Sequence, residues 1–154
     1  MVNRQEAPDA LEPIRTLLNT WSIPNDTRQP ADVFEGPAEL RALRDDLRRA
    51  VEDATPEAIN PWVGRLRVCP VLRDGRIEWT GRGDGATIVG AVLTAIADGT
   101  WPRLKACPDC RWVFYDHTRN GSKRWCLMTA GGSAGRSCGS IAKVRAHRER
   151  RASA

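Results

Sequence analysis

Apolar residues recur at helical spacing in the first hundred residues of the chain. Residues 9–20 and 37–54 each carry a leucine-rich stripe at every third or fourth position, which predicts two amphipathic helices that bury those stripes. Residues 86–98 are apolar almost throughout and predict a helix that is largely buried. A short helix with proline in its first turn is expected over residues 55–63, and a loop over residues 21–37.

A β-hairpin is expected over residues 65–80. Apolar and polar residues alternate on either side of Asp74-Gly75, which is a favoured two-residue turn. Cys69 falls in the first strand and is expected to be a small buried residue, because it has no partner at metal-ligand spacing. The glycine-rich stretch 81–85 lacks the Gly-Lys-Ser/Thr of a phosphate-binding loop and the glycine spacing of a dinucleotide site. We therefore do not expect it to bind a nucleotide.

Charge divides the chain into two parts of opposite sign. Residues 1–100 hold 12 lysines and arginines against 16 aspartates and glutamates, whereas residues 101–154 hold 12 against 3. The basic part suggests a polyanionic partner, with a solvated basic tail as the alternative. No apolar run is long enough to span a bilayer and residues 1–13 show no signal peptide, so we expect a cytoplasmic protein without membrane contact.

Four of the five cysteines lie close together, with the spacing C-x2-C-x15-C-x11-C. The odd number of cysteines and the lack of a secretory signal argue against a disulfide framework. Four thiolates are the ligands of a closed structural zinc site, and metal binding would stabilise a module too small to have a core of its own. We therefore predict zinc, with a redox pair, an iron–sulfur cluster or ligation by His117 as less favoured alternatives. The predicted ligands are Cys107, Cys110, Cys126 and Cys138.

The residues around these cysteines predict a finger of the treble-clef type. The first two cysteines flank a tight turn, called here the knuckle, and residues 111–126 predict a hairpin with its turn at Asn120-Gly121. In its first strand the side chains are expected to alternate, with Trp112 and Phe114 on one face and Val113 and Tyr115 on the other. Cys138 opens a basic helix, whose N-terminal dipole would stabilise the thiolate. The expected fold class is α+β, mainly α, with two domains: a small helical domain with a β-hairpin over residues 1–100 and the treble-clef-like zinc finger over residues 101–154.

The stretch LKACPDCRWVFYDHTRNGSKRWC, together with the later Cys-Gly and basic helix, resembles the CGNR zinc finger proteins. Their motif has the form C-x-x-C, W-x-F-x-D, S/T-R-N, R-R-W-C-S-M and C-G-N-R, followed by a lysine and an arginine-rich helix. Two departures are visible, because the name-giving tetrapeptide reads CGSI here and a Gly/Ser-rich insertion precedes it. The matching residues are Cys107, Cys110, Trp112, Phe114, Asp116, Thr118, Arg119, Asn120, Arg124, Trp125, Cys126, Met128, Cys138, Gly139 and Lys143.

The resemblance implies DNA binding, because proteins of that family are described as bacterial-type, stress-induced transcription regulators. More loosely, the LLNTW stretch at residues 17–21 resembles the opening of the ABATE domain, the helical domain that accompanies this finger. If the arginine that is absent from the tetrapeptide touches nucleic acid in the family, the affinity or specificity of this chain differs.

A zinc-dependent, DNA-binding transcription regulator is the function we expect, with the finger's basic helix in or across the major groove. The rival is a zinc-stapled protein-interaction or purely structural module that binds no nucleic acid. An enzyme is not expected, because four thiolates leave no open metal position. In the first domain a small-molecule effector or a protein partner is possible, with Trp21, Trp62 and Trp79 as candidate pocket residues. The expected nucleic-acid contacts are Lys123, Arg124, Lys143, Arg145, Arg148, Arg150 and Arg151.

Overall fold

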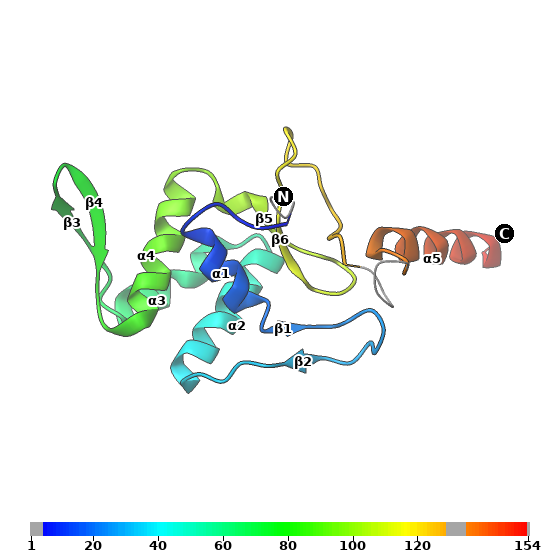
Figure 1. The fold of residues 1–154 in the computed structure, drawn as a ribbon, viewed down its shortest axis with the longest axis horizontal. Coiled ribbons are helices and arrows are strands. Elements are labelled where there is room, and N and C mark those ends of the chain that lie inside the picture. Colours follow the sequence, from blue (N-terminus) through cyan, green and yellow to red (C-terminus); the bar gives the residue numbers. More distant parts are fainter. Residues whose placement is uncertain (1–4, 129–134, 154) are drawn as a thin grey trace.

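The computed structural model of the protein describes residues 5–128 and 135–153. A helical body lies between a β-hairpin that projects on one side and a C-terminal helix that projects on the other (Figure 1). Within these two ranges, no helix combines the length and the hydrophobicity that a membrane-spanning segment requires. In chain order the elements are α1 (Leu11–Leu18), β1 (Trp21–Ser22), β2 (Ala31–Asp32), α2 (Ala38–Glu52), the 3₁₀-helix η1 (Pro56–Ile59), α3 (Asn60–Arg65), β3 (Cys69–Arg73), β4 (Arg76–Thr80), α4 (Gly83–Ala97), the 3₁₀-helix η2 (Trp101–Arg103), β5 (Leu104–Ala106), β6 (Val113–Tyr115) and α5 (Cys138–Ala152).

Helices α1, α2 and α4 form the body around the main hydrophobic core. Leu18, Leu43, Leu47, Val89 and Val92 are completely buried there, and burial of each such side chain contributes about 1.5–3 kcal/mol before entropy is counted. These residues belong to the apolar segments of the sequence, so the three long helices are confirmed. The glycine-rich stretch supplies the first turn of α4, which therefore begins three residues earlier than expected.

The projecting hairpin of β3 and β4 has the expected turn at Asp74-Gly75, and both turn residues have positive φ. Its base is held against α4 by Trp79, which lies so close to Gly90 that an added Cβ would meet the Cβ of Trp79 at 2.5 Å. The expected burial of Cys69 is wrong, because its side chain is exposed. The strands extend past the body (Figure 1), so the alternating pattern of this hairpin does not mark a buried face beyond Trp79.

Strand β6 pairs with β5, in the register Leu104↔Tyr115, Lys105↔Phe114 and Ala106↔Val113. The expected hairpin partner, residues 122–126, forms no strand. The pairing is therefore a correction: the knuckle itself is the connection between the two strands. The expected alternation of side chains is confirmed, because Val113 and Tyr115 join the main core whereas Phe114 packs around the cysteines.

Polar side chains of the N-terminal half hold the edge of β6. The amide of Asn19 donates from Nδ2 to the Val113 carbonyl at 2.8 Å and accepts from the Val113 N–H at 2.7 Å. Arg48 of α2 donates to the carbonyls of Leu18 and Arg111, at 2.7 and 2.8 Å. Since Asn19 lies in the LLNTW stretch, one function of that motif is to join the helical body to the cysteine-rich part.

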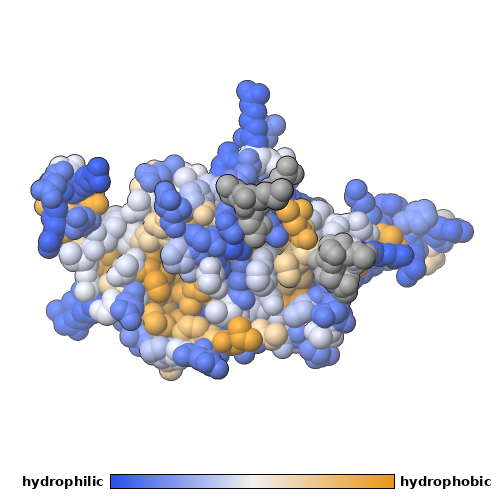
Figure 2. Space-filling model, viewed as in Figure 1, coloured by the Kyte–Doolittle hydropathy of each residue, from blue (hydrophilic) through white to orange (hydrophobic). Residues whose placement is uncertain are grey.

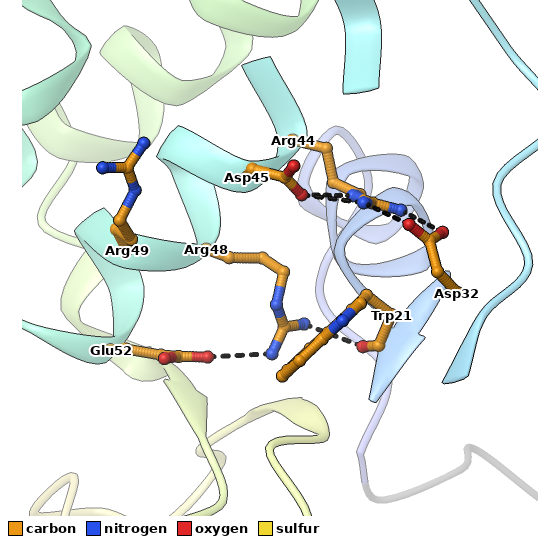
Figure 3. A pocket seen from close by; sticks show the side chains of 7 residues that line it. All are labelled: Trp21, Asp32, Arg44, Asp45, Arg48, Arg49 and Glu52. Carbon is orange, nitrogen blue, oxygen red and sulfur yellow. Dashed lines mark hydrogen bonds and ion pairs between the residues drawn. The ribbon is translucent and has the colours of Figure 1, made fainter. Parts of the chain in front are cut away.

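A charged pocket lies between α2 and the β1–β2 pair (Figure 3). Arg44, which is 1 % exposed, donates to Asp32 at 2.7 and 2.9 Å and to Asp45, while Arg48 stacks on the ring of Trp21. The three candidate pocket tryptophans lie apart: Trp21 lines this pocket, Trp62 is buried in the core and Trp79 packs on α4.

The ion pair at this pocket predicts a pH-dependent stability. Hydrogen bonds from Arg44 hold the pKa of Asp32 well below its usual range. The resulting stabilisation is fully present above the unfolded pKa of about 4 and is lost as pH falls through the folded value. Replacing Asp32 by Asn should therefore lower the free energy of unfolding most at pH 7, and the difference from the parent should shrink below pH 4.

Urea unfolding followed by helical circular dichroism measures this difference at each pH. Asp26→Asn is the matched control, because Asp26 is exposed and, among the described residues, accepts a hydrogen bond only from the neighbouring Thr27 N–H. Any metal lost at acid pH is lost from both proteins, so only their difference is compared. A deficit for D32N that stays constant from pH 7 to pH 3 would contradict the assignment.

Candidate metal centre

The knuckle follows directly from β5. Cys107 comes immediately after the strand, and a tight turn returns the chain to β6, closed by hydrogen bonds from Arg111 N to Cys107 O at 3.0 Å and from Cys107 N to Trp112 O at 2.9 Å. Arg111 has φ of 61°, in the left-handed region. This turn places the sulfur atoms of Cys107 and Cys110 on the same side of the chain, as two ligands of one ion require.

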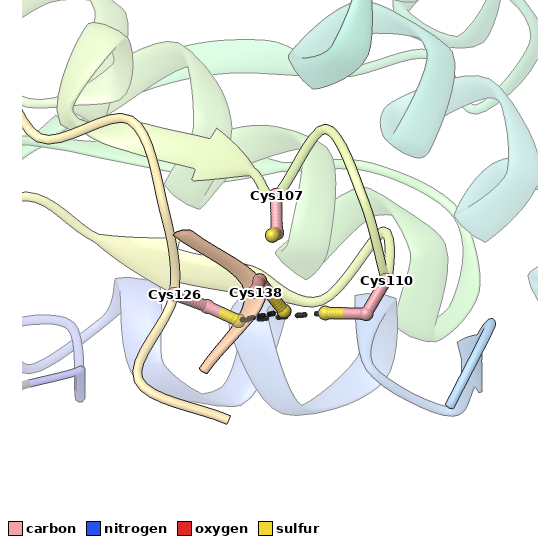
Figure 4. A group of neighbouring side chains, drawn as sticks. All are labelled: Cys107, Cys110, Cys126 and Cys138. Atoms are coloured by element: carbon pink, nitrogen blue, oxygen red, sulfur yellow. Dashed lines mark hydrogen bonds between the residues drawn. The ribbon is translucent and has the colours of Figure 1, made fainter. Parts of the chain in front are cut away.

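The sulfur atoms of all four clustered cysteines lie close together (Figure 4). They lie within 4.8 Å of one another, with Cys126 at 3.4 Å from Cys110 and at 3.5 Å from Cys138. Disulfide bonding needs about 2.05 Å, so these are free thiols. Zinc–sulfur bonds of about 2.3 Å in a tetrahedron put sulfur atoms about 3.8 Å apart, and the observed spacing fits that requirement.

The four sulfurs lie in a second, smaller apolar cluster. The cysteines are 0–3 % exposed, and Phe114 is completely buried beside them with Trp112 and Trp125 partly covering the outside. At the start of α5, Gly139 lies against the Trp125 ring, where an added Cβ would meet the indole at 3.3 Å. This close approach lets the helix bring Cys138 to the centre.

Mutual proximity perturbs the thiols strongly. Hydrogen bonds from Cys110 and Cys126 lower the pKa of Cys107, whereas the contact with Cys107 raises the pKa of Cys110 to about 12 and raises that of Cys126 as well. The thiols therefore cannot all ionise together as neighbours without a cation. A divalent metal bound among them supplies that positive charge, as in closed structural zinc sites.

A buried carboxylate shapes the chain between β6 and Cys126. Asp116 is completely buried and accepts hydrogen bonds from Lys105 Nζ and the N–H of Lys123, both at 2.8 Å, and from Thr118. Burial alone would raise the pKa of Asp116, but these hydrogen bonds hold it well below its usual range. Asp116 thus replaces the expected strand pairing as the interaction that turns the chain back toward the metal centre.

The structure places the seven expected nucleic-acid residues in two groups. Lys123 and Arg124 lie beside the metal cluster, with their cationic groups 5.2 Å from the Phe114 ring and 5.6 Å from the Trp125 ring. The others are exposed on α5, and Arg145 forms an ion pair there with Asp109 at 3.6 Å. The remaining α5 residues form no ion pair with any residue that the structure describes; they are Lys143, Arg148, Arg150 and Arg151.

Some residues around the centre carried no signal in the sequence. Asn25 donates to the sulfur of Cys138, and Arg28 pairs with the knuckle residue Asp109. Of these three residues, only Asp109 could be linked to the metal site from the sequence, because it lies between two of the predicted ligands. By contrast, His117 lies outside the sulfur group, where its Nε2 contacts the carbonyl of Glu6 at 2.7 Å, so it does not replace a thiolate.

Four buried thiols at tetrahedral spacing define a structural zinc centre. Comparison with protein-family models specifies it further: residues 103–151 match the CGNR zinc finger. This match includes all four cysteines, so the zinc-binding C-terminal part of the chain is similar to this finger in its metal ligands. No curated protein is similar enough to the chain to count as a relative.

Serine substitutions test the ligand set. We expect Cys126→Ser and Cys138→Ser to lose stoichiometric zinc and to unfold at lower temperature, because binding supplies about 10–16 kcal/mol in isolated zinc-finger peptides. Cys69→Ser is the matched control, since this thiol is exposed on the β3–β4 hairpin. Zinc content after dialysis and thermal unfolding measure both effects. Retention of one tightly bound zinc by C138S would exclude Cys138 as the fourth ligand.

Proposed function

We propose that the protein is a DNA-binding transcription regulator whose zinc finger presents α5 to nucleic acid. The observation that carries this proposal is the helix itself. It has five lysines and arginines and one glutamate, and it extends away from the body of the molecule (Figure 1). A 15-residue helix is about 22 Å long, and an α-helix fits the major groove of B-DNA.

The exposed side of α5 suits a phosphate backbone. Arg136, Arg145 and Arg148 surround a shallow cavity floored by Ile141 and Val144. Val144 is 37 % exposed, so its side chain is open to a ligand. Arginines can bind phosphate oxygens while an apolar floor contacts sugar or a thymine methyl group.

The hydrophilic surface of α5 agrees with this proposal. In the space-filling view the projecting helix is mostly blue, whereas apolar side chains gather over the helical body (Figure 2). The apolar body favours packing with protein or a small molecule, and the basic helix favours a polyanion. We further propose that residues 1–100 act as an ABATE-like regulatory part; the support is the LLNTW stretch and its direct bonds to β6.

Removing exposed positive charge from α5 tests DNA binding. The triple substitution Lys143→Ala, Arg148→Ala and Arg151→Ala should weaken binding to duplex DNA and reduce the slope of log K against log salt by about 2.7, since each phosphate contact contributes about 0.9. Fluorescence anisotropy over a range of salt concentrations measures both quantities, with zinc content checked for each protein.

The control removes the same charge at the opposite end of the molecule. Arg73, Arg76 and Arg82 are exposed on or beside the β3–β4 hairpin, and their replacement by Ala should leave the salt slope unchanged. Equal losses in both triple variants would indicate a nonspecific effect of net charge. If the parent protein bound no duplex DNA at low salt, the proposal would fail in favour of a structural or protein-binding finger.

A further inference from the structure

The loop between β1 and β2, residues 23–30, contacts the metal centre from outside the finger. Its Asn25 donates from Nδ2 to the Cys138 sulfur at 2.8 Å, although the two residues are 113 positions apart. The backbone N–H of Ile23 donates to the Cys110 carbonyl at 2.9 Å. The loop therefore contacts a ligand in the knuckle and the ligand that opens α5.

Arg28 connects these contacts to each other. Its Nη1 lies 3.2 Å from Asn25 Oδ1 and 3.2 Å from Asp109 Oδ1. Because the guanidinium donates to the amide oxygen, the amide nitrogen of Asn25 is the atom left to face sulfur. Arg28 thus orients Asn25 while it holds the knuckle.

The carboxylate of Asp109 extends the connection to α5. Its side chain is 3 % exposed, and Oδ1 pairs with both Arg28 and Arg145. The other oxygen, Oδ2, has no hydrogen-bond partner among the residues that the structure describes. A buried carboxylate needs compensating charge, and four thiolates with one divalent ion already leave an excess of negative charge. The two arginines supply the positive charge at this point.

These contacts form a closed ring from Cys138 through Asn25, Arg28, Asp109 and Arg145 back to the same helix. Cys138 and Arg145 are seven residues apart on α5, about 10 Å along the axis. Contacts at two points on a helix determine its direction, whereas one metal–sulfur bond leaves it free to pivot. The ring therefore accounts for the orientation of a helix that otherwise extends away from the body.

We propose that residues 23–30 act as a clamp on the zinc centre, in which Asn25 is an outer hydrogen-bond donor to the Cys138 thiolate and the Arg28–Asp109–Arg145 contacts set the direction of α5. In this arrangement Arg145 is a positioning residue, whereas Arg148 is available to a ligand. The proposal goes beyond DNA binding and does not depend on it.

Zinc release tests the outer donor. Loss of an outer-shell partner typically weakens a metal site 10–100-fold, so transfer of zinc to a coloured chelator should be about 10-fold faster for Asn25→Ala than for the parent. Asn25→Asp keeps the side-chain shape but puts a carboxylate beside a thiolate, and it should release zinc faster still. Thr27→Ala, in the same loop, is the matched control, since within the part of the chain that the structure describes its hydroxyl accepts only a 3.4 Å bond from Gln29 N.

The cobalt-substituted proteins provide a second measurement of the same contact. The sulfur-to-cobalt charge-transfer band should shift in N25A and N25D but not in T27A, because the donor acts on the sulfur itself. Release rates and spectra of N25A and N25D that equal those of T27A would overturn the role of Asn25.

Backbone ¹⁵N relaxation of the zinc-loaded protein tests the direction of the helix. In the parent, order parameters of residues 143–151 should approach about 0.85, the value of a rigid backbone. They should fall in Arg145→Ala and Asp109→Asn and stay unchanged in Arg148→Ala, one turn further along the same helix. Equal order parameters in R145A and R148A would refute the clamp, and neither measurement uses nucleic acid, so failure of DNA binding would leave this result standing.

Discussion

The convergence of four sulfur atoms around one ion is the constraint on which the C-terminal part of this protein depends. The knuckle, the residues near Cys126 and the start of α5 come from separate segments, and they meet only where the sulfurs lie within 4.8 Å of one another. Thiolates at that separation repel one another, so the arrangement requires a divalent cation. We therefore expect the folding of this module to depend on zinc binding.

Residues of the helical body also hold the zinc-binding module in place. Asn19 holds the edge of β6, Arg48 reaches the carbonyl of Arg111, and Asn25 donates to a ligand sulfur. Val113 and Tyr115, both from the finger, are buried in the core of the body. Both parts of the chain therefore hold the basic helix α5 in place. A structural change in the helical body can alter the position of α5 through these hydrogen bonds and ion pairs.

Buried polar groups account for much of this construction. Arg44, Asp116 and Asp109 are nearly inaccessible, and each is paired with an opposite charge. Burial makes such groups expensive when unpaired, which links the position of each partner to the fold. The pairs join segments that the hydrophobic core does not order: Arg44 holds the strand β2, Asp116 holds the turn beyond β6, and Asp109 holds α5.

Local sequence patterns were enough to predict the helices α1, α2 and α4, the Asp74-Gly75 turn and the four metal ligands. Each of these follows from local spacing, since helical periodicity, turn chemistry and ligand intervals are properties of neighbouring residues. The sequence also placed Phe114 and Val113 on opposite faces of one strand. No local pattern predicted that β6 pairs with β5, that Cys69 is exposed or that Asn25 donates to the sulfur of Cys138. The strand pairing and the Asn25 contact join segments that lie far apart in the chain, and such contacts leave no periodic pattern in the sequence. Cys69 is exposed because its hairpin extends beyond the hydrophobic core, although the alternation of apolar and polar residues predicted a buried face.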